Sequence, residues 1–159
     1  MGKISEASQL LATCSCGGCR VKLNKTPQQR FFCHCTICQK VYDKPFADAT
    51  ITLARNVEVL TPDTITYTRH KAPPVLDRGT CQECNDPVVG FLKMAALPKL
   101  AFMPVAVLPN LAALPAASRH IHYATRISDI RDDLPKADGE LASFVALIPD
   151  IVRVIAKSG

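Results

Sequence analysis

The chain has 159 residues, of which 48% are hydrophobic and 21% are charged. That length is enough for one domain with its own core, so the eight cysteines are not needed to hold a mini-protein together. The formal charge of +5 is spread over the chain without a long basic run, which argues against a dedicated nucleic-acid surface.

The first half of the chain predicts short strands separated by turns. A turn at Gly17-Gly18 joins the first two strands, and a turn at Pro62-Asp63 joins the last two. Thr36–Tyr42 predicts one or two helical turns with Thr36 as the N-cap. The expected strands of this half are Leu10–Cys16, Cys19–Leu23, Arg30–Cys33, Phe46–Leu53, Val57–Leu60 and Thr64–Thr68.

The second half predicts further strands and then a helical tail. Pro73-Pro74 indicates a loop, and the Ala-, Leu- and Pro-rich Pro109–Ser118 predicts no clear element. In Glu140–Lys157 the apolar residues recur at helical spacing, and Pro149 predicts a break into two helical pieces. These pieces either cover the sheet or meet a partner chain in a homodimer. The expected strands are Val75–Thr80, Val88–Phe91, Leu100–Leu108 and His120–Ala124.

The sequence predicts neither an export signal nor a membrane span. Its first residues lack a long apolar core and a convincing cleavage site. Residues 88–117 are rich in apolar side chains, but two lysines and four prolines interrupt them too often for a membrane helix. We therefore expect a cytoplasmic protein, and in that reducing compartment cysteines favour metal binding over disulfides.

Cys19 extends the first cysteine pair to the same C-x-C-x-x-C spacing as the second group, and the other seven cysteines form short C-x-C and C-x-x-C groups. They are Cys14 and Cys16, then Cys33, Cys35 and Cys38, and finally Cys81 and Cys84. Such gaps let thiolates from one turn reach a common ion at about 2.3 Å, and zinc suits thiolate ligands. Scattered cysteines that pack as small hydrophobic residues would not explain this spacing. The pattern therefore predicts zinc.

The spacing suits two zinc ions with different ligand sets. A closed structural site takes four ligands, whereas a catalytic site takes three and keeps one exchangeable position. The first and last pairs would fill one site, and the triad of Cys33, Cys35 and Cys38 would form the second. Cys19 is then either a buried thiol or a fourth ligand that closes the triad. Seven thiolates and two ions would bring the net charge to about +2.

The order of these motifs resembles the glutathione-dependent formaldehyde-activating enzyme family, which also includes centromere protein V. The resemblance covers roughly residues 8–137 and leaves 138–159 as a C-terminal helical tail. The matching segments are Cys14-Ser-Cys16-Gly17, Cys33-His-Cys35-Thr-Ile-Cys38, Pro45-Phe46-Ala47, Cys81-Gln-Glu-Cys84, His120-Ile121 and Asp133-Leu134-Pro135.

The resemblance implies an all-β fold, a small tent of antiparallel sheets that zinc holds together. It also implies a zinc-dependent carbon–sulfur lyase that acts on a thiol–aldehyde adduct such as S-hydroxymethylglutathione, with glutathione as the small thiol. The alternative is a non-enzymatic zinc module that binds protein or nucleic acid, as centromere protein V would suggest. By position, the structural ligands become Cys14, Cys16, Cys81 and Cys84, and the catalytic ion is held by Cys33, Cys35 and Cys38.

The chain departs from the family pattern at a few positions. Asn85 stands where a glycine usually follows the last cysteine, and asparagine tolerates the left-handed conformation that such a turn can need. Asp43-Lys44 precede Pro45, Ser128-Asp129 replace a usual tryptophan, and Cys19 replaces a small apolar residue. These departures leave the expected zinc ligands in place. They do not fix the identity of the substrate, because the wall of the pocket is the part that varies.

Other ionisable residues are weaker candidates. His34 lies inside the triad and either donates a hydrogen bond to a sulfur or is a spacer that faces solvent. His120 and His122 alternate on the expected last strand, so they should share one face. Residues 69–71 form a small basic group that either meets a glutathione carboxylate or belongs to a solvated loop.

Overall fold

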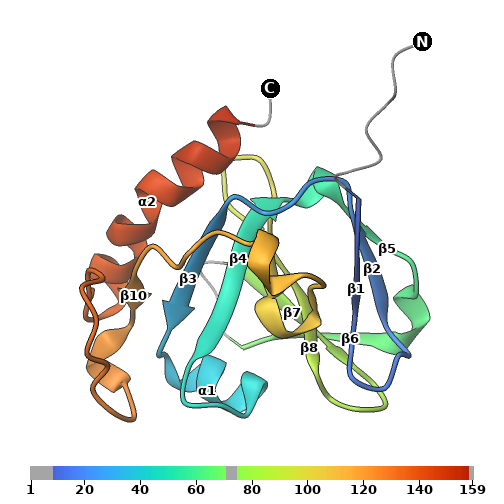
Figure 1. The fold of residues 1–159 in the computed structure, drawn as a ribbon, viewed down its shortest axis with the longest axis horizontal. Coiled ribbons are helices and arrows are strands. Elements are labelled where there is room, and N and C mark those ends of the chain that lie inside the picture. The colour runs from blue at the N-terminus through green and yellow to red at the C-terminus, as the bar shows by residue number, and fades with distance from the viewer. Residues whose placement is uncertain (1–8, 71–74, 158–159) are drawn as a thin grey trace.

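The computed structural model describes residues 9–70 and 75–157. They form a three-stranded sheet, a seven-stranded sheet and a long helix near the C-terminus. Figure 1 shows the long helix, α2, at one side of the large sheet and the small sheet at the other. The mostly β fold with a C-terminal helix agrees with the sequence prediction.

The small sheet is antiparallel and has the strand order β1-β2-β5. Its strands are β1 (Leu10–Thr13), β2 (Arg20–Leu23) and β5 (Val57–Val59). Val21 and Leu23 on the central strand are fully buried, because alternate residues of a strand point to the same face. The sequence placed these three strands correctly.

The large sheet has the order β10-β3-β4-β9-β8-β7-β6. All its pairings are antiparallel except that of β10 with β3, so the expectation of purely antiparallel sheets is wrong at this edge. The long segment between β3 and β10 makes the parallel return geometrically feasible. The strands are β3 (Gln29–Cys33), β4 (Ala47–Leu53), β6 (Ile65–Arg69), β7 (Val75–Cys81), β8 (Pro87–Lys93), β9 (Leu100–Pro104) and β10 (His120–Ile121).

Three expected strands are clearly shorter than predicted. The strand expected to reach Cys16 ends at Thr13. The strand expected to reach Leu108 ends at Pro104, where the chain turns into a 3₁₀ helix. The strand expected to reach Ala124 ends at Ile121, because His122 adopts a left-handed φ of 52°. The predicted loop at Pro73-Pro74 lies outside the described residues. The 3₁₀ helices are η2 (Ala54–Asn56), η3 (Pro62–Thr64), η4 (Val105–Val107), η5 (Leu111–Ala113) and η6 (Tyr123–Thr125).

Helix α1 (Thr36–Tyr42) confirms the helical turns predicted after the triad, but its N-cap is Cys35 rather than Thr36. The Cys35 sulfur accepts a hydrogen bond from the backbone N–H of Cys38 at 3.2 Å. This bond takes the place of the serine or threonine oxygen that usually caps a helix. A residue that could bind metal therefore also fixes the start of the helix.

Helix α2 (Glu140–Ala156) is one continuous helix with Pro149 inside it, so the prediction of two pieces is wrong. Proline forfeits one helical hydrogen bond, but side chains on both sides of it are anchored to the same surface. Leu147 before the proline and Ile151 and Val154 after it are buried against the large sheet. Within the described ranges, no helix combines the length and the apolar character that a membrane crossing needs.

The two faces of the large sheet carry separate cores. One core lies between this sheet and the small sheet and includes Val21, Val88 and Met103. The other lies between this sheet and α2 and includes Ile51 and Leu147. The cysteine clusters divide between the cores in the same way, because Cys14 and Cys81 belong to the first and Cys33 and Cys38 to the second.

Candidate metal centres

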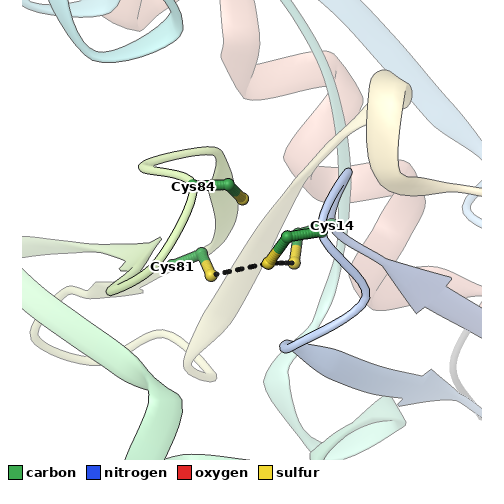
Figure 2. A group of neighbouring side chains, drawn as sticks. Cys14, Cys81 and Cys84 are labelled. Carbon is green, nitrogen blue, oxygen red and sulfur yellow. Dashed lines mark hydrogen bonds between the residues drawn. The ribbon is translucent and has the colours of Figure 1, made fainter.

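The first cysteine group joins the two sheets. Cys14 and Cys16 lie in the turn between β1 and β2, and Cys81 and Cys84 lie at the end of β7 and in the turn that follows. Their four sulfur atoms all lie within 4.8 Å of one another. Figure 2 shows Cys14, Cys81 and Cys84 turned toward a common point from these two segments.

The backbone of both turns is shaped for this convergence. Gly17 has a φ of 77° and Asn85 a φ of 62°, so each turn has a residue in the left-handed region. Asn85 thus adopts the left-handed conformation for which glycine is usual at this position. The N–H of Ser15 donates to a carboxylate oxygen of Asp86 at 2.8 Å and links the two turns directly.

Backbone N–H groups point at these sulfurs. The N–H of Cys19 donates to Cys14 Sγ at 3.2 Å, and the N–H of Gly18 donates to Cys16 Sγ at 3.4 Å. Burial raises the pKa of the Cys14 thiol, but the Cys19 N–H and the Cys16 thiol lower this pKa more, so it falls below its ordinary value. Donors of this kind favour thiolates, the form that binds metal.

Cys19 lies with the first group and is not a ligand in either cluster. It is fully buried, and its sulfur is within hydrogen-bond distance of the Thr64 side chain at 3.2 Å. It packs in the core of the small sheet, whereas the triad belongs to the other core. The alternative in which Cys19 closes the triad is therefore wrong, and the buried-thiol interpretation is confirmed.

The triad forms where β3 runs into α1. Cys33 is the last residue of β3, Cys35 caps α1, and Cys38 lies in the first turn of α1. Their three sulfur atoms lie within 4.8 Å of one another, and no fourth Cys, His, Asp or Glu among the described residues completes this group. Hydrogen bonds from Cys33 and Cys38 lower the pKa of Cys35 to about 2. The same contacts raise the pKa of Cys33 well above its usual range.

Both donor sets fit zinc. In a tetrahedral zinc site with zinc–sulfur bonds of about 2.3 Å, neighbouring sulfurs lie about 3.8 Å apart. In the first group, Cys14 Sγ and Cys16 Sγ are 3.5 Å apart, and Cys16 Sγ and Cys81 Sγ are 3.6 Å apart. Four sulfurs suit a closed site, and three suit a site with an exchangeable position.

A cavity of about 180 Å³ opens beside the triad. All three triad cysteines line it, together with side chains from the large sheet, α1 and α2. Arg78 lies on its wall, with Nη2 3.8 Å from Cys38 Sγ. His122 also lines the cavity. The triad is therefore next to a space that a small molecule can fill, whereas the first group joins two turns.

A buried pair of histidines supports the segment between Cys33 and Cys35. His34 is 1% exposed, and its Nε2 lies 2.8 Å from His120 Nδ1. His120 Nε2 lies 2.7 Å from a carboxylate oxygen of Asp132. With His120 Nε2–H donating to Asp132, His120 Nδ1 accepts from His34 Nε2–H. Burial lowers the pKa of His34 to about 4, so this imidazole is neutral at neutral pH.

This network corrects two predictions. His34 is not a solvent-facing spacer, and His120 and His122 do not share an environment, because one is buried in the network and the other lines the cavity. Sequence reasoning missed Asp132, whose pKa Lys136 and His120 lower to about 2. The only signal was its position just before the Asp133-Leu134-Pro135 motif.

The small basic group at residues 69–71 is partly described. Arg69 forms an exposed ion pair with Asp77, at 2.9 Å, as a solvated strand end would. Burial, and then the charges of Arg78 and Lys40, lower the pKa of His70. Lys71 lies outside the described residues.

The fold and the two cysteine groups define a small β protein with one four-cysteine site between its sheets and one three-cysteine site on a cavity. The chain matches the glutathione-dependent formaldehyde-activating enzyme family over residues 9–125, and it belongs to that family. The match includes all seven clustered cysteines and ends before α2.

Solved structures support the fold. A Rhodobacter sphaeroides protein determined by structural genomics aligns with a TM-score of 0.51 at 18% identity, covering 67% of this chain and 96% of its own. At that identity the likeness shows the fold alone. No curated protein matches the chain.

Proposed function

We propose that this protein is a zinc-dependent carbon–sulfur lyase that acts on a thiol–aldehyde adduct, with glutathione as the reference thiol. The observation that carries the proposal is the asymmetry of the two cysteine groups. Four sulfurs lie between the sheets, and three line a cavity with no fourth ligand from the described residues. A site with three protein ligands keeps one position for substrate.

In this proposal the first group, Cys14, Cys16, Cys81 and Cys84, holds a structural zinc ion, and Cys33, Cys35 and Cys38 hold the second. The second ion supplies a Lewis acid that favours the thiolate form of a substrate sulfur. The description of the family supports this activity, because it names a glutathione-dependent formaldehyde-activating enzyme. The cavity supports it because the three triad cysteines line it.

The proposed reaction needs no oxidant or reductant. In the cleavage direction the carbon–sulfur bond of the hemithioacetal breaks, its hydroxyl proton is released, and the oxygen forms the carbonyl of the aldehyde. The electron pair of the broken bond stays on sulfur, which leaves as a thiolate. In the reverse direction the thiolate attacks the aldehyde carbon.

The chain's own residues keep the triad in shape for this step. The His34 carbonyl accepts hydrogen bonds from Gln39 Nε2 at 2.8 Å and from Thr125 Oγ1 at 2.8 Å. The His34 N–H donates to the Ile121 carbonyl at 3.0 Å. With these bonds and the histidine pair, the loop between Cys33 and Cys35 is fixed before substrate arrives, so positioning costs little at the moment of reaction.

X-ray absorption at the zinc edge tests the proposal. Spectra are recorded on the two-zinc protein alone, with 2-mercaptoethanol and with glutathione. We expect one of the two zinc environments to gain sulfur or change its bond lengths with at least one thiol. Two four-sulfur environments that neither thiol alters would overturn the lyase and favour the non-enzymatic zinc module.

A variant links this signal to the triad. Cys38→Ser should remove the zinc that responds to thiols and should abolish exchange between S-hydroxymethylglutathione and free formaldehyde, followed by NMR. Cys19→Ser is the matched control, because Cys19 is a buried cysteine that lies outside both ligand groups. It should keep the thiol-responsive zinc and the exchange.

A further inference from the structure

Small residues form part of the sheet side of the cavity beside the triad, which we call its floor. Ala47 and Ala49 on β4 and Gly90 on β8 all line it. They face α2 from the middle of the large sheet, where neighbouring positions such as Ile51 and Leu92 carry large side chains. Because a methyl group or less projects here, the sheet leaves a hollow under the helix.

Helix α2 forms the opposite wall with apolar side chains. Phe144, Leu147 and Ile151 all line the cavity and recur at helical spacing. The family match ends at residue 125, so this wall comes from a part of the chain that the match does not include.

The size of the cavity limits what it can hold. An apolar cavity of about 150 Å³ binds a benzene molecule. The present cavity, of about 180 Å³, is slightly larger, so it matches one ring or a chain of similar bulk. A whole tripeptide such as glutathione, with about three times as many heavy atoms, would lie partly outside it.

The charge of the lining also disfavours glutathione. That thiol carries two carboxylates and one ammonium group at neutral pH. The charged residues that line the cavity, besides the cysteines, are Arg78 and Glu140, and Arg78 already lies against Cys38 Sγ. Burying carboxylates without matched cations is costly, whereas burying an apolar group against Phe144 and Leu147 is favourable.

We propose that the cavity is the specificity pocket for an apolar substituent, so that this protein prefers the aldehyde adduct of a small apolar thiol over that of glutathione. The sulfur lies at the triad, and the apolar group lies between the sheet floor and α2. This inference rests on the proposed function, because it assumes that a substrate sulfur reaches the second zinc.

Binding of two thiols to the two-zinc protein tests it. Benzyl mercaptan carries one ring next to its sulfur, and glutathione carries the charged tripeptide. Isothermal titration calorimetry gives the dissociation constants, and zinc-edge absorption shows whether each thiol reaches the metal. We expect benzyl mercaptan to bind at least about tenfold more tightly than glutathione, the gain that burial of one apolar ring provides.

Three variants locate the effect. Phe144→Asn places an amide in the apolar wall without adding charge, and Phe144 is 37% exposed, so the fold should tolerate it. It should weaken benzyl mercaptan about tenfold and leave glutathione unchanged. Val152→Asn is the matched control on the same helix, because Val152 is 56% exposed and does not line the cavity. Ala49→Leu, which fills the hollow from the sheet side, should weaken benzyl mercaptan like Phe144→Asn.

The outcomes separate this inference from the proposed function. If glutathione changes the zinc environment and binds as tightly as benzyl mercaptan, the specificity pocket is refuted and the lyase stands. If Phe144→Asn and Val152→Asn affect benzyl mercaptan equally, the pocket assignment is refuted as well. If neither thiol changes the zinc environment, the lyase itself fails, and this inference fails with it.

Discussion

A buried carboxylate on α2 is bonded to the segment that leads into β10, and this contact gives a test of how the cavity wall is held. Asp150 is fully buried, and its oxygens accept hydrogen bonds from Arg119 Nε at 3.0 Å and Nη2 at 3.2 Å. Ser118 Oγ donates to the same carboxylate at 2.7 Å. Arg153 also lies near it, at 3.8 Å, but that side chain is 59% exposed.

We predict that Arg119→Met destabilises the protein by about 3–5 kcal/mol, because it leaves a buried carboxylate without its close cation. Arg119 is only 16% exposed, so solvent screens little of the loss. At about 2–4 °C per kcal/mol for a protein of this size, the midpoint of thermal unfolding should fall by roughly 6–20 °C. Arg153→Met should cost at most about 1 kcal/mol, as exposed ion pairs do.

Urea unfolding of the zinc-loaded variants, followed by far-UV circular dichroism, measures these differences. A double variant, Arg119→Met with Asp150→Leu, separates charge from packing. It removes the unpaired carboxylate and should recover part of the stability lost in Arg119→Met. A cost below about 1 kcal/mol for Arg119→Met, or a double variant less stable than Arg119→Met, would refute the reasoning.

Three further predictions follow from the same structure. Cys38→Ser should lose about one zinc by elemental analysis and keep its circular dichroism spectrum, whereas Cys84→Ser should unfold the domain, because a zinc ion held by the first group would link the two sheets; equal effects would contradict this. Gly79→Ala should destabilise by about 1–3 kcal/mol in urea, since its Cβ would lie 2.8 Å from an Ile65 methyl and 2.9 Å from a backbone oxygen. Gly90→Ala, whose nearest contact is 3.4 Å, should stay within about 1 kcal/mol of the native protein, and a larger loss would show that the strand cannot adjust. Pro149→Ala should raise the thermal midpoint by restoring a helical hydrogen bond worth about 1–3 kcal/mol, and no rise would mean that the helix has adapted fully to proline.

Local residue chemistry explains the parts of the fold that the sequence predicted well. The strand-favouring residues of β4 and the turn residues around Gly17 act over a few positions, so these strands and turns follow from nearby residues. The left-handed conformation of Asn85 is also a local property, because asparagine tolerates a positive φ. Pro149 is the counterexample, because tertiary packing of Leu147 and Ile151 overrides its local tendency to end a helix.

Among the site residues, spacing indicated the cysteine groups, since thiolates that share an ion must come from one tight turn or from two. Spacing did not set Cys19 apart, because it follows Cys16 at the same distance in the chain as Cys38 follows Cys35. Spacing could not say where Cys19 lies, because that depends on which sheet face β2 presents to Thr64. It also could not pair His34 with His120, which are 86 residues apart in the chain and meet only through the parallel contact of β3 with β10.

The sequence by itself determined the family and the groups of cysteines, because cysteine spacing and family motifs are local features of the order of residues. Only the tertiary structure decided that the triad opens on an apolar cavity. That cavity exists because small residues on β4 and β8 face α2, which is more than 85 residues from β4 in the chain. A hollow is a property of packed surfaces, and no single segment of sequence contains both of its walls.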